Sequence, residues 1–86
     1  MVLSQVSSPD EVSTAARHAI EEMVPGAKVE VIPSSPGHYE ITVTSNAFEG
    51  KSKVQQQQLV YRAIFDLMQG DTAPIHAIDR LQTIVG

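Results

Sequence analysis

The sequence predicts an α/β domain of the α+β kind, with the element order αββαβ, a three-stranded mixed sheet and both helices on one face. Three observations predict it: an apolar stripe at helical spacing near the start, two alternating segments joined by a short loop, and a second helical stripe followed by a last alternating segment. A short connection pairs two strands antiparallel, whereas a helical crossover makes them parallel. The 86 residues have room for one domain. We expect it over residues 8–86, after a flexible leader over residues 1–7.

The first helix is predicted over residues 9–24. Ser8 can cap it, Pro9 suits the first helical position, and Glu11 stands three residues after the cap, as a capping box requires. Pro25-Gly26 ends the helix. Its apolar residues recur at the spacing of one helix face, which we expect to be Val12, Ala15, Ala16, Ala19, Ile20 and Met23.

Two strands should follow as an antiparallel hairpin. Residues 28–32 alternate and are rich in β-branched residues, and residues 38–45 alternate more clearly, with Tyr39, Ile41 and Val43 on one side. The segment between them, residues 33–37, contains two prolines, two serines and a glycine and is predicted to be a loop.

A turn over residues 46–51 should bury Phe48, and Gly50 there suits a backbone conformation that other residues disfavour. A second helix is predicted over residues 52–69, with Ser52 as its cap and Gly70 as its stop. The last strand is predicted over residues 75–85. The expected core consists of Val12, Ile20, Val29, Val31, Ile41, Val43, Val60, Ile64 and Leu67.

Composition excludes several classes of function. Six Lys and Arg against ten Asp and Glu give a net charge of −4, which argues against a strongly basic nucleic-acid binder. The absence of cysteine excludes disulfides, zinc fingers and thiol catalysis by this chain alone. No apolar run approaches the roughly 20 residues that span a bilayer, and the first residues do not resemble a signal peptide. We therefore expect a cytoplasmic protein that does not interact with membranes.

The residues by themselves do not indicate an enzyme. No phosphate-binding loop, zinc-protease motif or serine-nucleophile elbow is present. His18 falls on the polar face of the first helix and is expected to be solvated, as are Glu21, Glu22, Asp66 and Asp79. His38 and His76 lie far apart in the sequence, so their spacing alone predicts no metal site.

Three segments in order resemble the BolA family. The resemblance covers roughly residues 28–82, and the ordered set is more specific than any single piece. The first segment is the strand from His38 to Ser45. The second contains Phe48, Gly50, Ser52 and Val54, followed by Gln56-Gln57-Gln58, Val60 and Tyr61. The third is Ile75-His76-Ala77. Val54, Val60 and Tyr61 are expected on or beside the buried face of the second helix.

This resemblance implies a fold similar to a class II KH domain and an intracellular partner. BolA-like proteins pair with monothiol glutaredoxins, and the pair shares a [2Fe–2S] cluster for which glutaredoxin and its glutathione supply thiolate sulfur. The resemblance implies His76 as a ligand and a second ligand from the loop between the first two strands. Histidine is a known alternative to thiolate on one iron of such a cluster. The isolated chain is expected to hold no cluster.

The sequence departs from the family pattern in three places. The usual position of the loop ligand is Ser35, which leaves His38 as the candidate second ligand. Gln56-Gln57-Gln58 stands where the better-known branch has Arg-His-Arg. The family often continues after the last strand into a further helix, whereas this sequence stops at Gly86, so we expect the surface that this helix covers to be bare.

Three functions follow as hypotheses. The first is a non-enzymatic adaptor in iron–sulfur handling that acts with a monothiol glutaredoxin. The alternative is a transcriptional regulator that binds DNA weakly through its KH-like face, with Lys51, Lys53 and Arg62 as the contacting cations. The third is a small interaction domain with neither role. Alone, the chain is expected to be a monomer or a weak dimer.

Overall fold

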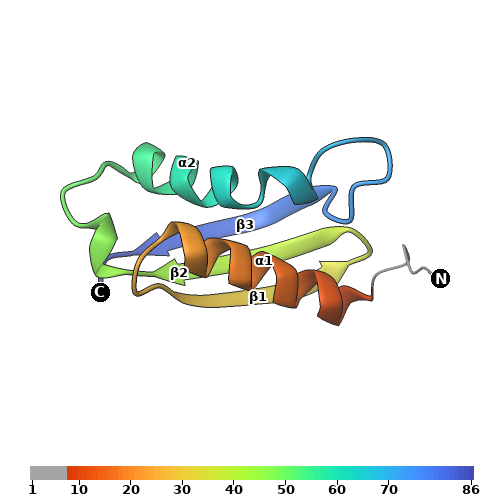
Figure 1. Cartoon of the computed structure of the whole chain (residues 1–86), viewed down its shortest axis with the longest axis horizontal. Helices are drawn as coiled ribbons and strands as arrows, with labels where there is room; N and C mark the ends of the chain where they lie inside the picture. The colour runs from red at the N-terminus through yellow and green to blue at the C-terminus, as the bar shows by residue number, and fades with distance from the viewer. Residues whose placement is uncertain (1–7) are drawn as a thin grey trace.

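Three strands form one mixed sheet in the computed structural model, which describes residues 8–86. The strand order is β1-β2-β3, with β1 antiparallel to β2 and β2 parallel to β3. Both helices lie on the same face of this sheet (Figure 1), so the predicted α+β class and αββαβ order are confirmed. The likeness to a class II KH domain stays a prediction, and the leader over residues 1–7 lies outside the described residues.

The elements are α1 (Pro9–Met23), β1 (Lys28–Ser35), β2 (His38–Thr44), the 3-10 turn η1 (Asn46–Phe48), α2 (Lys53–Ala63), the 3-10 turn η2 (Phe65–Leu67) and β3 (Ala77–Ile84).

Helix α1 begins with the predicted capping box. The Ser8 hydroxyl accepts a hydrogen bond from the Glu11 N–H (3.1 Å), and the Glu11 carboxylate accepts one from the Ser8 N–H (3.0 Å). The buried residues follow the strict i, i+4 ridge of Val12, Ala16, Ile20 and Val24. The predicted stripe is therefore too wide, because Ala15 and Met23 lie on its exposed flanks.

Strand β1 is longer than the sequence predicts. Residues Pro33 to Ser35 belong to it, with Pro33 opposite Tyr39 and Ser35 opposite His38, so the predicted loop shrinks to Pro36 and Gly37. Proline is tolerated here because β1 is an edge strand, where a missing N–H need not break a sheet hydrogen bond.

Helix α2 is shorter than predicted. Ser52 and Gln55 form its capping box, but the α-helix ends at Ala63 and continues only as the turn η2. The Ile75 N–H donates to the Leu67 carbonyl (3.0 Å), so the end of this segment is bonded to the chain entering β3 rather than to further helix. Gly70 lies beyond this point, and it does not stop the helix.

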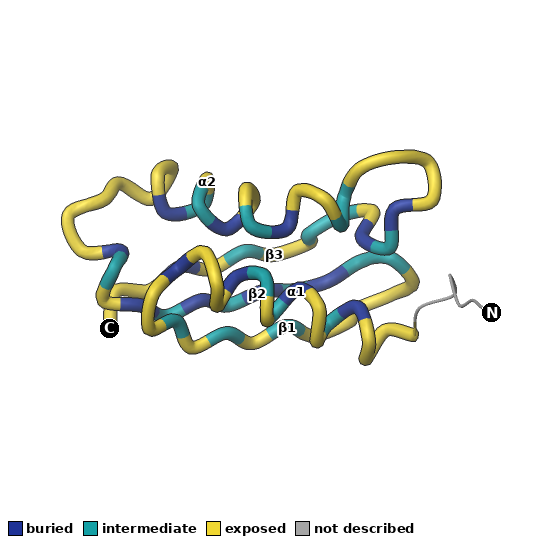
Figure 2. Tube along the Cα trace, viewed as in Figure 1, coloured by how far each residue is buried: buried dark blue, intermediate teal, exposed yellow. Residues whose placement is uncertain are grey.

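The core lies between the two helices and the sheet, where Figure 2 shows the buried stretches of the helices turned toward the strands. Of the predicted core, Val29, Val31 and Leu67 are only partly buried, because they lie at its margin. Phe48 is fully buried, as predicted. Val54 and Tyr61, by contrast, are exposed, so their predicted place beside the buried face is wrong. Across residues 8–86, no helix combines the length and apolar character needed to cross a bilayer.

Candidate metal-binding end of the sheet

The two candidate ligands, His38 and His76, come to the same end of the sheet. His38 opens β2 and lies opposite Ala77, the first residue of β3, so His76 stands immediately before that strand rather than in it. The Gly37 carbonyl joins the two segments, since it accepts hydrogen bonds from the His76 N–H (2.7 Å) and the Ala77 N–H (3.1 Å). The β1–β2 turn, the loop before β3 and the start of α1 gather at this end (Figure 1).

Gly37 packs directly against the His76 side chain. A Cβ placed on Gly37 would lie 2.9 Å from the His76 Cγ and 3.0 Å from its Nδ1, closer than such atoms approach. The φ angle of Gly37 is +78°, which only glycine adopts readily. Glycine is therefore required at position 37 for two reasons: its backbone conformation and the space that the His76 imidazole occupies. The His76 residue is exposed to solvent.

His38 is held by a carboxylate from the neighbouring strand. Its Nδ1 lies 2.9 Å from Oδ1 of Asp79, and the Ser34 hydroxyl donates to the other carboxylate oxygen, Oδ2, at 2.9 Å. Ser34, His38 and Asp79 come from β1, β2 and β3 in turn, so the carboxylate ties the three strands together. Asp79 falls where the β2–β3 register shifts between Tyr39 and Glu40. Its side chain is 43% exposed, as expected of a solvated carboxylate, but the sequence did not predict its two hydrogen bonds.

These hydrogen bonds fix the chemical state of the pair. The bond from His38 lowers the pKa of Asp79 most, the bond from Ser34 adds to this, and partial desolvation opposes it. Asp79 is therefore an ionised carboxylate at neutral pH, and a carboxylate can only accept hydrogen bonds. The His38 Nδ1 must carry the proton of this bond, and in the neutral imidazole Nε2 then has the lone pair.

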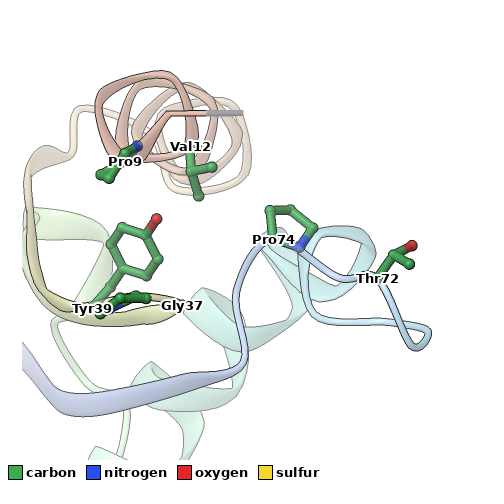
Figure 3. A pocket seen from close by; sticks show the side chains of 7 residues that line it. Pro9, Val12, Gly37, Tyr39, Thr72 and Pro74 are labelled. Carbon is green, nitrogen blue, oxygen red and sulfur yellow. The ribbon is translucent and has the colours of Figure 1, made fainter. Parts of the chain in front are cut away.

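The other face of the same end has a cleft of about 380 Å³. Figure 3 shows the Tyr39 phenol in this cleft, with its hydroxyl toward Pro9 and Val12 of α1. Tyr39 is buried, and burial raises the pKa of its phenol. Because Tyr39 follows His38 in β2, the two side chains lie on opposite faces of the sheet. The cleft is lined by Pro9, Val12, Pro36, Gly37, Tyr39, Thr72 and Pro74.

Of the remaining candidates, Ser35 lies at this end and His18 lies on α1. Ser35, where the family resemblance implies a loop ligand, is an exposed residue at the end of β1, directly opposite His38. His18 is exposed on α1, as predicted. Within the part of the chain that the structure describes, no group of three or more His, Cys, Asp or Glu side chains is arranged to hold a metal ion.

The three cations of the DNA hypothesis do not act alike. Lys51 and Arg62 are exposed and line one shallow hollow of about 180 Å³ on α2. The Lys53 ammonium instead donates to the Thr83 carbonyl, and it lies 3.4 Å from the Thr83 hydroxyl. The same hydroxyl donates to the buried Gln56 side chain (2.6 Å), a partner that the sequence did not reveal.

Comparison with known proteins gives a consistent result. The model of the family described as BolA-like protein matches residues 10–83. The BolA1 protein of Mus musculus is 26% identical, with a TM-score of 0.68 over 99% of this chain and 72% of that one. A BolA homologue from Coxiella burnetii is also 26% identical, with a TM-score of 0.68 over 93% and 92%. The BolA domain of SufE1 from Arabidopsis thaliana shares the fold, at 19% identity and a TM-score of 0.70 over 93% and 95%. Among curated proteins, none matches the sequence.

Proposed function

The chain belongs to the BolA-like family, and on this premise we propose that it is a non-enzymatic adaptor that partners a monothiol glutaredoxin and shares a [2Fe–2S] cluster with it. The observation that carries the proposal is the exposed His76 at the end of the sheet, next to the strand that begins with His38. A cytoplasmic location belongs to the same proposal. We also propose that the chain is a monomer or a weak dimer in the absence of the partner.

The placement of His76 suits a ligand shared with another protein. A metal ligand needs a neutral imidazole nitrogen that a partner can approach. His76 meets this need because it precedes β3 at the end of the sheet and is exposed. Its backbone is held by the Gly37 carbonyl, so the side chain projects from an ordered position rather than from a free loop.

The donor set of this chain fits a shared cluster. The 86 residues contain no cysteine, so in this proposal the thiolate sulfur comes from glutaredoxin and its glutathione. When bound, a cluster with imidazole on one iron has a higher reduction potential than one with thiolates alone. The residues of this chain that would hold it are His76 and His38.

The proposal is tested by mixing the chain with a cluster-loaded monothiol glutaredoxin and recording visible absorption and circular dichroism. A stable complex whose visible spectrum differs from that of loaded glutaredoxin is expected. His76→Ala should fold normally, as judged by far-ultraviolet circular dichroism, and should change this spectrum, because no other side chain replaces the imidazole at that position. His18→Ala, which removes an exposed histidine of α1, is the control and should change neither signal.

Two results would overturn the proposal. If no cluster-bearing complex forms with any monothiol glutaredoxin tested, the partner is wrong. If the complex forms and His76→Ala leaves its spectrum intact, the assignment of His76 is wrong.

DNA binding is the second candidate, and one observation favours it. Lys51 and Arg62 line the same hollow on α2, where two phosphates of a nucleic acid could lie. The Lys53 ammonium, however, is hydrogen-bonded to Thr83, and the net charge of the chain is −4. The glutaredoxin proposal therefore stands first.

A further inference from the structure

The hydrogen bonds of Asp79 use both oxygens of its carboxylate. Oδ1 accepts from the His38 Nδ1 and Oδ2 from the Ser34 hydroxyl, each at 2.9 Å. A carboxylate bonded at both oxygens to two different strands cannot turn freely. The imidazole ring of His38 is consequently fixed as well, although the two side chains are 40% and 43% exposed.

This arrangement is the one that metal-binding histidines commonly have. Such a histidine usually donates its second ring N–H to a carboxylate or carbonyl, which fixes the tautomer and makes the metal-binding nitrogen more basic. In the present chain Nδ1 is the donor to Asp79, which leaves the lone pair on Nε2. The hydrogen bond to Asp79 sets this tautomer in the isolated chain, so Nε2 is available before any metal arrives.

The hairpin explains why a ligand on the strand is needed. Its turn has only two residues, Pro36 and Gly37, and the usual ligand position is Ser35. A serine hydroxyl is a poor ligand for iron compared with imidazole or thiolate. The neighbouring Ser34 hydroxyl is already bonded to Asp79. His38 lies directly opposite Ser35 in the register, so it brings an imidazole beside the position where the loop ligand is absent.

We propose that Asp79, steadied by Ser34, is a positioning residue that holds His38 with Nε2 available, so that His38 is the second imidazole ligand of the shared cluster. This inference rests on the proposed function. It differs from the ligand set that the family resemblance implies, because the second ligand comes from strand β2 instead of the hairpin loop, and because a residue of β3 prepares it.

The first test uses the isolated chain and needs no cluster. Long-range ¹H–¹⁵N correlation spectra at about pH 8, above the usual imidazole pKa of about 6.5, report which ring nitrogen carries the proton. His38 should be the Nδ1–H tautomer. In Asp79→Ala it should shift toward a mixture of tautomers, whereas Ser34→Ala removes only the bond to Oδ2 and should largely keep the Nδ1–H form. A predominant Nε2–H tautomer in the unmodified chain would overturn the inference.

The second test uses the complex with cluster-loaded glutaredoxin. With ¹⁵N-histidine in this chain, pulsed electron paramagnetic resonance of the reduced cluster should show two nitrogen couplings. His76→Ala and His38→Ala should each remove one. Asp79→Ala should keep the fold, because the hydrogen bonds it removes lie outside the buried core. It should weaken retention of the cluster about 10- to 100-fold, the usual effect of removing the partner of a metal-bound histidine.

The outcomes separate this inference from the proposed function. A complex with a single nitrogen coupling, lost only in His76→Ala, overturns the role of His38 and Asp79 while the proposed function stands. The role of His38 and Asp79 is also overturned if the Asp79→Ala and Ser34→Ala variants retain the cluster equally well. Failure to obtain any cluster-bearing complex overturns the proposed function and this inference with it.

Discussion

The His76 imidazole packs against Gly37 so closely that a Cβ at position 37 would lie 2.9 Å from the His76 Cγ. The same glycine accepts backbone hydrogen bonds from His76 and Ala77 through its carbonyl. A two-residue turn between β1 and β2 thus determines where a side chain that precedes β3 can lie.

Gly37→Ala should therefore displace His76. At a φ of +78° alanine is strained by about 1–2 kcal/mol, and its methyl group would in addition contact the imidazole. Gly26→Ala is the matched control, because Gly26 has a φ of +67° and nothing within 4 Å of an added Cβ. Urea denaturation should show the backbone cost in both variants, and Gly37→Ala should lose at least as much stability as Gly26→Ala because of the added contact. Only Gly37→Ala should change the imidazole NMR signals of His76, and equal effects on those signals would contradict the packing.

Ile64 tests the register of α2 against the sheet. It is fully buried beneath the C-terminal end of the helix, so Ile64→Ala should cost about 2–5 kcal/mol, measured by urea denaturation. The adjacent Phe65 is 55% exposed, and Phe65→Ala should change stability by no more than about 0.5 kcal/mol. A variant at Ile64 that melts like the unmodified chain would show that the register is wrong.

Gln56 should differ from the other glutamines of α2. Its amide donates to the Lys51 and Phe48 carbonyls (2.9 and 3.3 Å) and accepts from the Thr83 hydroxyl. Gln56→Ala would remove these three hydrogen bonds, although the Phe48 carbonyl keeps the one from the Lys51 N–H (3.1 Å). The loss should cost about 1–3 kcal/mol in the free energy of unfolding. Gln58, two residues later, is exposed, so Gln58→Ala should be nearly neutral. Equal stability of the two variants would show that the buried hydrogen bonds contribute nothing.

Tyr39 should make the fold sensitive to alkali. Burial raises the pKa of its phenol, so above about pH 10 the folded chain keeps a proton that the unfolded chain loses. The folded state then binds more protons than the unfolded state, and stability must fall as the pH rises. Tyr39→Phe removes this loss, so its free energy of unfolding should fall less steeply between about pH 9 and 11 than that of the unmodified chain. Tyr61→Phe, which removes an exposed phenol, is the control and should keep the original slope.

Any binding of duplex DNA should be weak, independent of sequence and lost near physiological salt. Neutralising two or three phosphates gives a slope of log affinity against log salt no steeper than about −3. Fluorescence anisotropy over a salt series measures it, with the double variant Lys51→Ala, Arg62→Ala expected to abolish the residual binding. Sequence-selective binding that resists salt would place the regulator hypothesis ahead of the adaptor.

Much of the fold follows from interactions that are local in the sequence. The capping box of Ser8 and Glu11 joins residues three apart, and the alternation of Tyr39, Ile41 and Val43 follows from the geometry of a strand. The need for glycine at position 50, with a φ of +81°, is likewise a property of one residue. Such features depend on neighbouring residues only, so the sequence by itself determined the element types, their order and the class of the fold.

The end of the sheet depended on contacts between distant residues, and only the tertiary structure decided it. His38 and Asp79 are 41 residues apart, and no pattern around Asp79 distinguished it from a solvated carboxylate. Gln56 bonds to Thr83, 27 residues away, and the end of the turn η2 at Leu67 bonds to Ile75 of the chain that leads to β3. Strand pairing places Asp79 beside His38, because a shift of one residue in the register would turn every side chain of a strand to the other face. The sequence therefore supplied His38, Asp79 and His76 as separate candidates, and the pairing of β2 with β3 brought them together.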